Sequence, residues 1–125
     1  MSIQKKLSGS GFAPLQVTNI IGDNDYGETA TGSNAAGAFN ISACNTYFTT
    51  VASSTGAILP PGNTGAPSTV SLGDEYMIAN TGANALTVYP PSGGTVNGGA
   101  SVSIAANALA YFTCVSTNGL TWISK

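Results

Sequence analysis

Short segments in which apolar and polar residues alternate run along most of this chain. In "ALAYFTCVS" (108–116), Leu109 and Tyr111 fall on one face, and Phe112 and Cys114 fall on the other. Alternation with a period of two predicts a β-strand. Similar segments predict further strands at 15–20, 38–43, 46–51, 68–72, 75–80, 85–90, 100–105 and 120–125.

Turn-forming residues separate the segments, as in "NTGAN", "PPSGG", "VNGG" and "STNG". The last of these predicts a short hairpin loop before the final strand, and Asn107 predicts a turn between two strands. Because glycine or proline interrupts almost every possible helix, helices are not expected. The pattern predicts an all-β fold, an antiparallel β-sandwich or barrel of jelly-roll-like form.

Two segments differ from this pattern. Residues 1–14 contain Gly-Ser spacing and a lysine pair, which predicts an extended N-terminal arm. Residues 15–125 are expected to form a single β-sandwich domain, in which residues 22–37 make a polar loop. Trp122 is expected to anchor the core from the final strand.

Composition changes the picture of the surface. Charged residues make up 6% of the chain, against about 25% in typical soluble domains. Three lysines and no arginine do not make a phosphate-binding face, so nucleic-acid binding is not expected. No apolar run approaches the roughly 20 residues that span a bilayer, and no signal peptide is evident. Since the predicted strands are apolar on both faces, one face is expected to pack in the core and the other against a partner.

Candidate chemistry is sparse. The chain has no histidine, so Ser-His-Asp and Cys-His arrangements cannot form, and we expect neither enzymatic activity nor a cofactor. Cys44 and Cys114 are expected to be two buried thiols, with a single disulfide between two strands as the alternative. The segment "DNDYGE" resembles the start of a calcium loop, and Asp23, Asp25 and Glu28 are its candidate ligands. The glycine is one residue early and the twelfth position lacks a glutamate, so an acidic exposed loop is the favoured interpretation.

Residues 56–124 resemble a β-rich module of tailed bacteriophage and prophage virion proteins. The resemblance rests on a strand with the pattern N-x-G-A-N-x-L-x-V-Y-P (Asn80 to Pro90), a V-N-G turn (Val96 to Gly98), Y-F-x-C (Tyr111 to Cys114) and a closing tryptophan (Trp122). It implies a structural module of head decoration (cement) proteins or of fibre domains. A separate chain of this size fits decoration better, since fibre proteins are usually longer.

The resemblance thus implies a capsid decoration protein that stabilises a phage head by packing and by β-edge contacts. The expected partners are the major capsid protein and further copies of the chain, in a homotrimer, without nucleic acid or membrane. The expected location is the outer surface of the virion, after synthesis in the host cytoplasm. Candidate interface residues are Lys5, Lys6, Leu7, Phe12, Tyr89, Pro90, Pro91 and Tyr111. The alternative is a receptor- or carbohydrate-binding module of a tail fibre or spike, because exposed tyrosines can stack on sugars.

Overall fold

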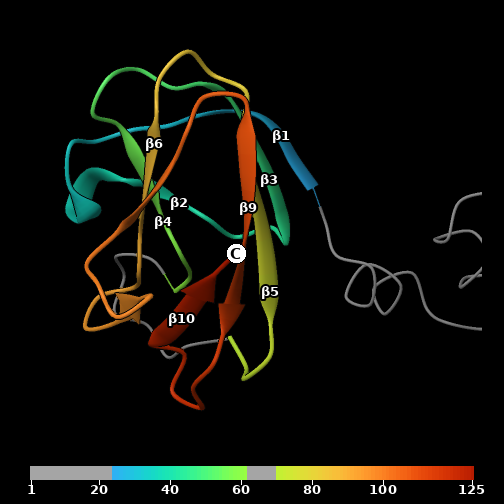
Figure 1. The fold of residues 1–125 in the computed structure, drawn as a ribbon, viewed down its shortest axis with the longest axis vertical. Coiled ribbons are helices and arrows are strands. Elements are labelled where there is room, and N and C mark those ends of the chain that lie inside the picture. The colour runs from blue at the N-terminus through green and yellow to red at the C-terminus, as the bar shows by residue number, and fades with distance from the viewer. Residues whose placement is uncertain (1–23, 62–69) are drawn as a thin grey trace, which may run out of the picture.

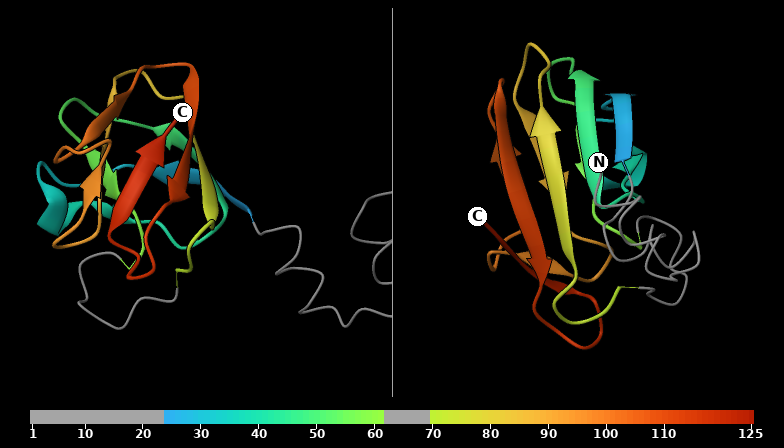
Figure 2. Two further views of the ribbon diagram at one scale, coloured as in Figure 1. Left: turned by 60° about the horizontal axis from the view of Figure 1, so that its bottom comes forward. Right: turned by 90° about the vertical axis from the view of Figure 1, so that its right-hand side faces the viewer.

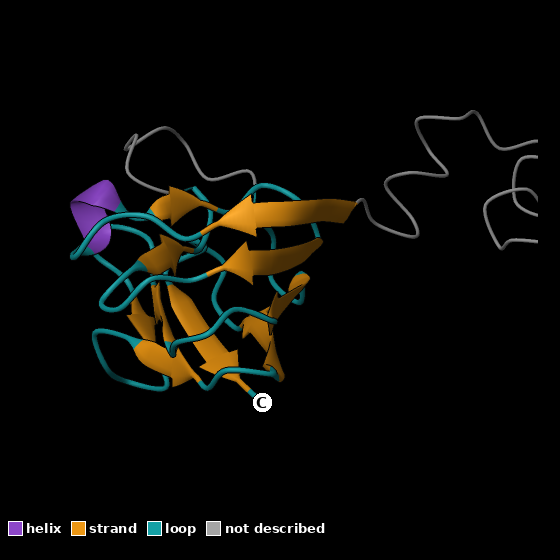
Figure 3. Ribbon diagram, turned by 90° about the horizontal axis from the view of Figure 1, so that it is seen from above, coloured by secondary structure: helices purple, strands orange, loops and turns teal. Residues whose placement is uncertain are grey.

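The computed structural model describes residues 24–61 and 70–125. These ranges contain ten β-strands, one three-residue 3-10 helix and no α-helix, which confirms a β-rich fold (Figure 3). No helix in them is long or apolar enough to cross a membrane. The elements are β1 (Asn24–Thr29), η1 (Ala35–Gly37), β2 (Phe39–Asn40), β3 (Asn45–Thr50), β4 (Gly56–Ile58), β5 (Glu75–Asn80), β6 (Leu86–Tyr89), β7 (Thr95–Val96), β8 (Val102–Ile104), β9 (Ala108–Cys114) and β10 (Thr121–Ser124).

The strands form two sheets that face each other (Figure 1). Sheet A has six strands in the order β1-β3-β5-β9-β10-β7, and sheet B has four in the order β2-β4-β6-β8. From β1 to β9 the chain alternates between the two sheets, so that odd-numbered strands lie in sheet A and even-numbered strands in sheet B. The early part of the fold therefore winds in coils, as in a short β-solenoid.

This winding overturns the expectation of antiparallel, jelly-roll-like pairing. The neighbouring pairs β1/β3, β3/β5, β2/β4, β4/β6 and β7/β10 are parallel. Only β5/β9, β9/β10 and β6/β8 are antiparallel among the described strands. The reason is geometric. From β1 to β6, each return of the chain to a sheet runs in the same direction as the preceding strand of that sheet, so these neighbours pair in parallel. The chain then reverses: β8 returns antiparallel to β6, β9 returns antiparallel to β5, and a hairpin makes β10 antiparallel to β9.

The core lies between the sheets. Its largest fully buried side chains, Trp122, Phe48 and Phe112, come from sheet A, and Leu86 and Val88 oppose them from sheet B. The Trp122 indole packs at 5.7 Å from the Tyr76 ring, and its Nε1–H donates to the Gly119 carbonyl at 3.0 Å. The expectation that Trp122 anchors the core is confirmed.

Most predicted strands are present within a few residues of the expected bounds, and 75–80 forms β5 as expected. Three predictions need correction. Residues 24–29, expected in a polar loop, form β1; 38–43 contributes only the two residues of β2; and Val70–Leu72 is coil and turn. β4 and β7 were not expected at all. The predicted strand at 15–20 and the arm at 1–14 lie outside the described residues.

A buried amide connects the two sheets at the end of β5. Asn80 is fully buried, and its Nδ2 donates to the carbonyls of Asn84 (2.8 Å), Ile104 (3.0 Å) and Ala105 (3.3 Å). Its Oδ1 accepts from the Gly82 N–H at 2.9 Å. Since Asn80 ends β5 of sheet A and Ile104 ends β8 of sheet B, this side chain links the two sheets and also satisfies backbone groups of the adjacent loops.

Thr46 provides a stability test inside the core. It is fully buried on β3, and its Oγ1 has no hydrogen-bond partner among the described residues. Thr46→Val keeps the shape and removes an unsatisfied hydroxyl, so it should raise the free energy of unfolding by about 1 kcal/mol. Urea titration measures this. The control is Thr49→Val on the exposed face of the same strand, which should change stability by less than about 0.5 kcal/mol.

Neither cysteine forms a disulfide; Cys114 is buried and Cys44 is half-buried. Cys44 precedes β3 and Cys114 ends β9, and β5 lies between these strands. Two strand spacings amount to roughly 9–10 Å, which exceeds the about 7 Å between Cα atoms that a disulfide spans. The prediction of two thiols is confirmed, but only Cys114 is buried as expected, and the disulfide alternative is wrong.

A thiol count checks this directly. Purified without reductant and then denatured, the chain should react with two equivalents of a thiol reagent, whereas a disulfide would leave none. In the native state Cys44 should react before Cys114, because the Cys114 side chain is 1% exposed.

Candidate functional site

The outer face of sheet A is the candidate functional surface. It is the face of β1, β3, β5, β9 and β10 that points away from the core, and it is turned toward the viewer in the right-hand view of Figure 2. Its apolar side chains are Tyr26, Tyr47, Met77, Leu109, Tyr111 and Ile123. Tyr26 is 78% exposed, Leu109 54%, Ile123 48% and Tyr111 42%.

Strand register explains why these side chains gather. Tyr26 on β1 lies opposite Tyr47 on β3, and their rings are 6.0 Å apart. Tyr47 pairs with Ala79 on β5, and Ala79 pairs with Leu109 on β9. Residues paired in this way point to the same side of the sheet. Four adjacent strands thus present one continuous row of apolar residues, with the small Ala79 at 7% exposure between larger neighbours.

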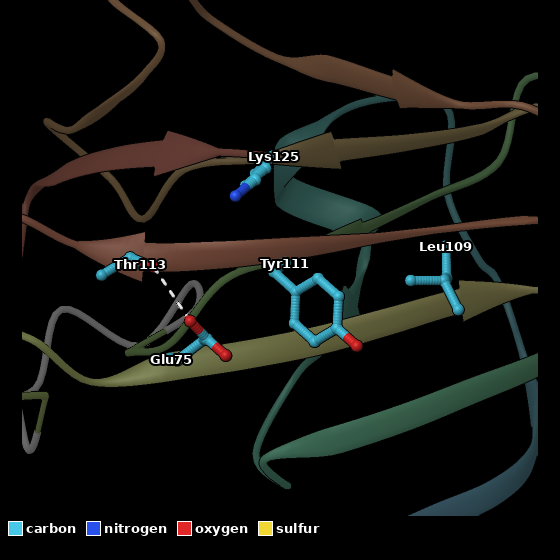
Figure 4. A pocket seen from close by; sticks show the side chains of 5 residues that line it. All are labelled: Glu75, Leu109, Tyr111, Thr113 and Lys125. Carbon is cyan, nitrogen blue, oxygen red and sulfur yellow. Dashed lines mark hydrogen bonds between the residues drawn. The ribbon is translucent and has the colours of Figure 1, made fainter.

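A second row crosses the same face. Met77 on β5 pairs with Tyr111 on β9, and Tyr111 exchanges both backbone hydrogen bonds with Lys125. A shallow depression of about 420 Å³ lies at this row, lined by Glu75, Leu109, Tyr111, Thr113 and Lys125 (Figure 4). In Figure 4 the Tyr111 ring lies between Glu75 and Leu109, so it forms the apolar centre of the depression.

Glu75 and Lys125 are the charged side chains of the depression. The Glu75 Oε2 accepts a long hydrogen bond of 3.5 Å from the Thr113 hydroxyl. Lys125 carries the only cationic side chain among the residues that the structure describes. The two lie on opposite sides of β9, since Glu75 is on β5 and Lys125 follows β10. The depression therefore presents one charged side chain of each sign around an apolar centre.

The sheet edges are less suited to a partner than this face. The edge strand β1 carries Asp25 and Glu28, and its pairing with β3 shifts register on both sides of Glu28. Charges and bulges on an edge strand hinder the addition of another strand. The other described edges, β2, β7 and β8, are two or three residues long. The geometry thus favours contact through the face of sheet A over the β-edge contacts expected from the sequence.

The structure divides the predicted interface residues. Tyr111 is exposed on the outer face of sheet A, and Tyr89 is half-buried at the end of β6. Pro90 and Pro91 are buried in the domain, so little of either is free to contact a partner. Four further candidates lie outside the described residues: Lys5, Lys6, Leu7 and Phe12.

The calcium candidates do not lie in a described loop. Asp23 is outside the described residues, and Asp25 and Glu28 belong to β1. Gly27, at φ +82°, separates Asp25 from Glu28 at the bulge. No group of three or more histidine, cysteine, aspartate or glutamate side chains occurs within 24–61 and 70–125. A strand does not wrap an ion as a calcium loop does, so the described part of the segment favours the acidic-surface interpretation over the loop.

Sequence reasoning missed several residues of the outer face. Tyr26 was placed in a polar loop, and Met77 and Ile123 were not singled out. Alternation identifies Ile123, because Trp122 must point inward and its neighbour must then point outward. Tyr26 had no comparable indication, since the acids and glycine around it resemble a loop.

No known protein-family model matches this chain, and no curated protein matches it either.

Proposed function

We propose that this chain is a structural protein of a tailed-phage virion that decorates the head and cements it by burying its surface. The observation that carries the proposal is the outer face of sheet A, where large apolar side chains are exposed side by side across neighbouring strands. Apolar patches of this kind on a soluble chain mark sites of protein contact. Burial of such a face supplies free energy of association without any catalytic group.

The near absence of charge supports the same role. Decoration proteins cover a shell in many copies, and neighbouring copies with strong net charge would repel one another. A formal net charge of −2 over 125 residues leaves little repulsion. An uncharged surface also avoids the free-energy cost of removing unpaired charges from water.

The residues that carry the phage resemblance support a shared architecture. Asn80, Gly82 and Asn84 of the N-x-G-A-N pattern all take part in the junction between the sheets. A Cβ on Gly82 would lie 2.7 Å from the Val51 backbone nitrogen, so the position needs glycine. Because such residues determine the fold and not the partner, the resemblance supports a virion module and leaves the contact surface to the outer face of sheet A.

On this proposal the partners are the major capsid protein and further copies of the chain, on the outer surface of the virion. Contact occurs through the outer face of sheet A. The arm at 1–14 is proposed to reach along the shell or to a neighbouring copy, and the homotrimer remains a prediction.

The depression around Tyr111 favours one alternative, a carbohydrate-binding tail-fibre or spike module. An exposed tyrosine ring with a carboxylate and an ammonium at its border offers both stacking and hydrogen bonds to a sugar. A glycan array distinguishes this carbohydrate-binding alternative from head decoration. Saturable binding that Tyr111→Ala abolishes supports the alternative, and a flat array supports decoration.

The main test is the composition and structure of the phage particle. Mass spectrometry of purified particles should find the chain in many copies, and cryo-microscopy should place it on the outside of the head. If the chain is absent from the head or occupies only the tail tip, decoration is wrong.

A further inference from the structure

We infer that the outer face of sheet A binds a second copy of this chain, in a two-fold pair in which Glu75 of each copy lies against Lys125 of the other. The inference deepens the proposed function, on which it rests, by naming the surface through which copies associate. The two-fold pair differs from the homotrimer expected from the sequence, and the mass of the assembled chain distinguishes the two.

The size of the apolar surface fits a protein partner. Tyr26, Leu109, Tyr111 and Ile123 are each between 42% and 78% exposed. At roughly 200 Å² for a large side chain, their exposed portions amount to about 400 Å². A stable interface buries about 800 Å² on each partner, of which a little over half is apolar. The face therefore supplies nearly the whole apolar share of one side of such an interface.

Charge complementarity favours a second copy as the partner. The depression holds one carboxylate and one ammonium, and these two do not form an ion pair within the described residues of the chain. A neutral partner would bury both charges unpaired, and a partner of either charge would repel one of them. A second copy of the same face offers both charges, so that the carboxylate of each copy can pair with the ammonium of the other.

A two-fold axis places these groups together. β9 lies between β5 and β10 in sheet A, so Glu75 and Lys125 lie on opposite sides of it. Rotation about a two-fold axis that lies in the plane of the interface and runs parallel to β9 brings β5 of one copy over β10 of the other. Leu109 and Tyr111, both on β9, then lie at the centre of the contact, and Tyr26 lies toward the rim. Sheets stack face to face at about 10 Å, a spacing that these side chains fill.

The test measures the mass of the purified full-length chain as a function of concentration, by sedimentation equilibrium. We expect a mass twice the 12.4 kDa of one chain, with dissociation on dilution. Glu75→Lys and Lys125→Glu should each weaken pairing at least about tenfold, because like charges then face each other twice. The combined Glu75→Lys/Lys125→Glu variant should restore pairing to within about threefold of the original.

A matched pair of leucines separates contact from general surface effects. Leu109→Lys should weaken pairing by at least about tenfold, whereas Leu72→Lys, at 59% exposure in the turn before β5 and outside the strands of the face, should change it less than about twofold. Circular dichroism on each variant checks that the fold is retained.

A monomer at all concentrations, a trimer, equal effects of the two leucine variants, or a double charge variant as weak as the single ones would overturn the inference. The test of pairing can fail independently of the test of the proposed function. A monomeric chain found on the outside of phage heads refutes the pairing and keeps decoration, and a paired chain absent from particles does the reverse.

Discussion

Replacement of Asn80 with alanine is expected to lower the free energy of unfolding by about 4 kcal/mol, the larger of two effects at the end of β5. The Asn80 amide is fully buried, donates to three carbonyls and accepts from the Gly82 N–H. Alanine leaves the buried Ile104 carbonyl and Gly82 N–H without these partners, together with the part-buried carbonyls of Asn84 and Ala105. The midpoint of urea denaturation, followed by tryptophan fluorescence, measures the change.

Asn84→Ala is the matched control. The Asn84 side chain donates one hydrogen bond, to the Val51 carbonyl at 2.9 Å, and the residue is exposed. Its removal should cost about 1 kcal/mol. If Asn80→Ala costs no more than Asn84→Ala, the buried amide does not hold the sheets together as described.

Replacement of Trp122 with alanine is expected to lower the free energy of unfolding by a similar amount, about 4 kcal/mol. The indole is fully buried in the core, where it packs on Tyr76 and donates a hydrogen bond to the Gly119 carbonyl. Alanine leaves a large cavity between the sheets. Trp122→Phe keeps most of the packing and loses the hydrogen bond, so about 2 kcal/mol is expected. Calorimetry measures both.

Leu72→Ala provides the comparison for Trp122. Leu72 is a large apolar side chain at 59% exposure, so its truncation should change stability by less than about 0.5 kcal/mol. Equal losses from Leu72→Ala and Trp122→Ala would contradict the assignment of Trp122 to the core.

The sequence predicts the strands better than it predicts their arrangement. β5, β9 and β10 follow from alternation, because their inward residues, such as Ile78, Phe112 and Trp122, are strongly apolar. β1 and β4 escape detection for different reasons. Asp25, Gly27 and Glu28 give β1 the composition of a loop, and the three residues of β4 are too few to show a period.

The topology could not be predicted, because the residues of a turn do not indicate which of the two sheets the next strand joins. "NTGAN" joins β5 of sheet A to β6 of sheet B, while "STNG" joins β9 to β10 within sheet A. Both have the composition of hairpin loops. Only the second makes a hairpin, so five parallel pairings were missed.

The candidate site was partly predictable. Alternation places Leu109 and Tyr111 together on the face of β9 opposite Phe112, and an uncharged face predicts a partner. The neighbours of Tyr111 across the sheet depend on strand order, which local pattern does not encode. Asn80 shows the same limit. The pattern places it at the end of the strand 75–80 and the start of the "NTGAN" turn, but does not predict that its side chain is buried where β5 and β8 meet.

The central claim is that the outer face of sheet A is covered when the protein does its work. Hydroxyl-radical footprinting, read by mass spectrometry, tests it on two samples: the chain diluted until it is monomeric, and the same chain within purified phage particles. The account predicts that oxidation of Tyr111, Leu109 and Ile123 falls several-fold in the particle, because these exposed side chains become buried. Equal oxidation of these residues in the two samples would contradict it.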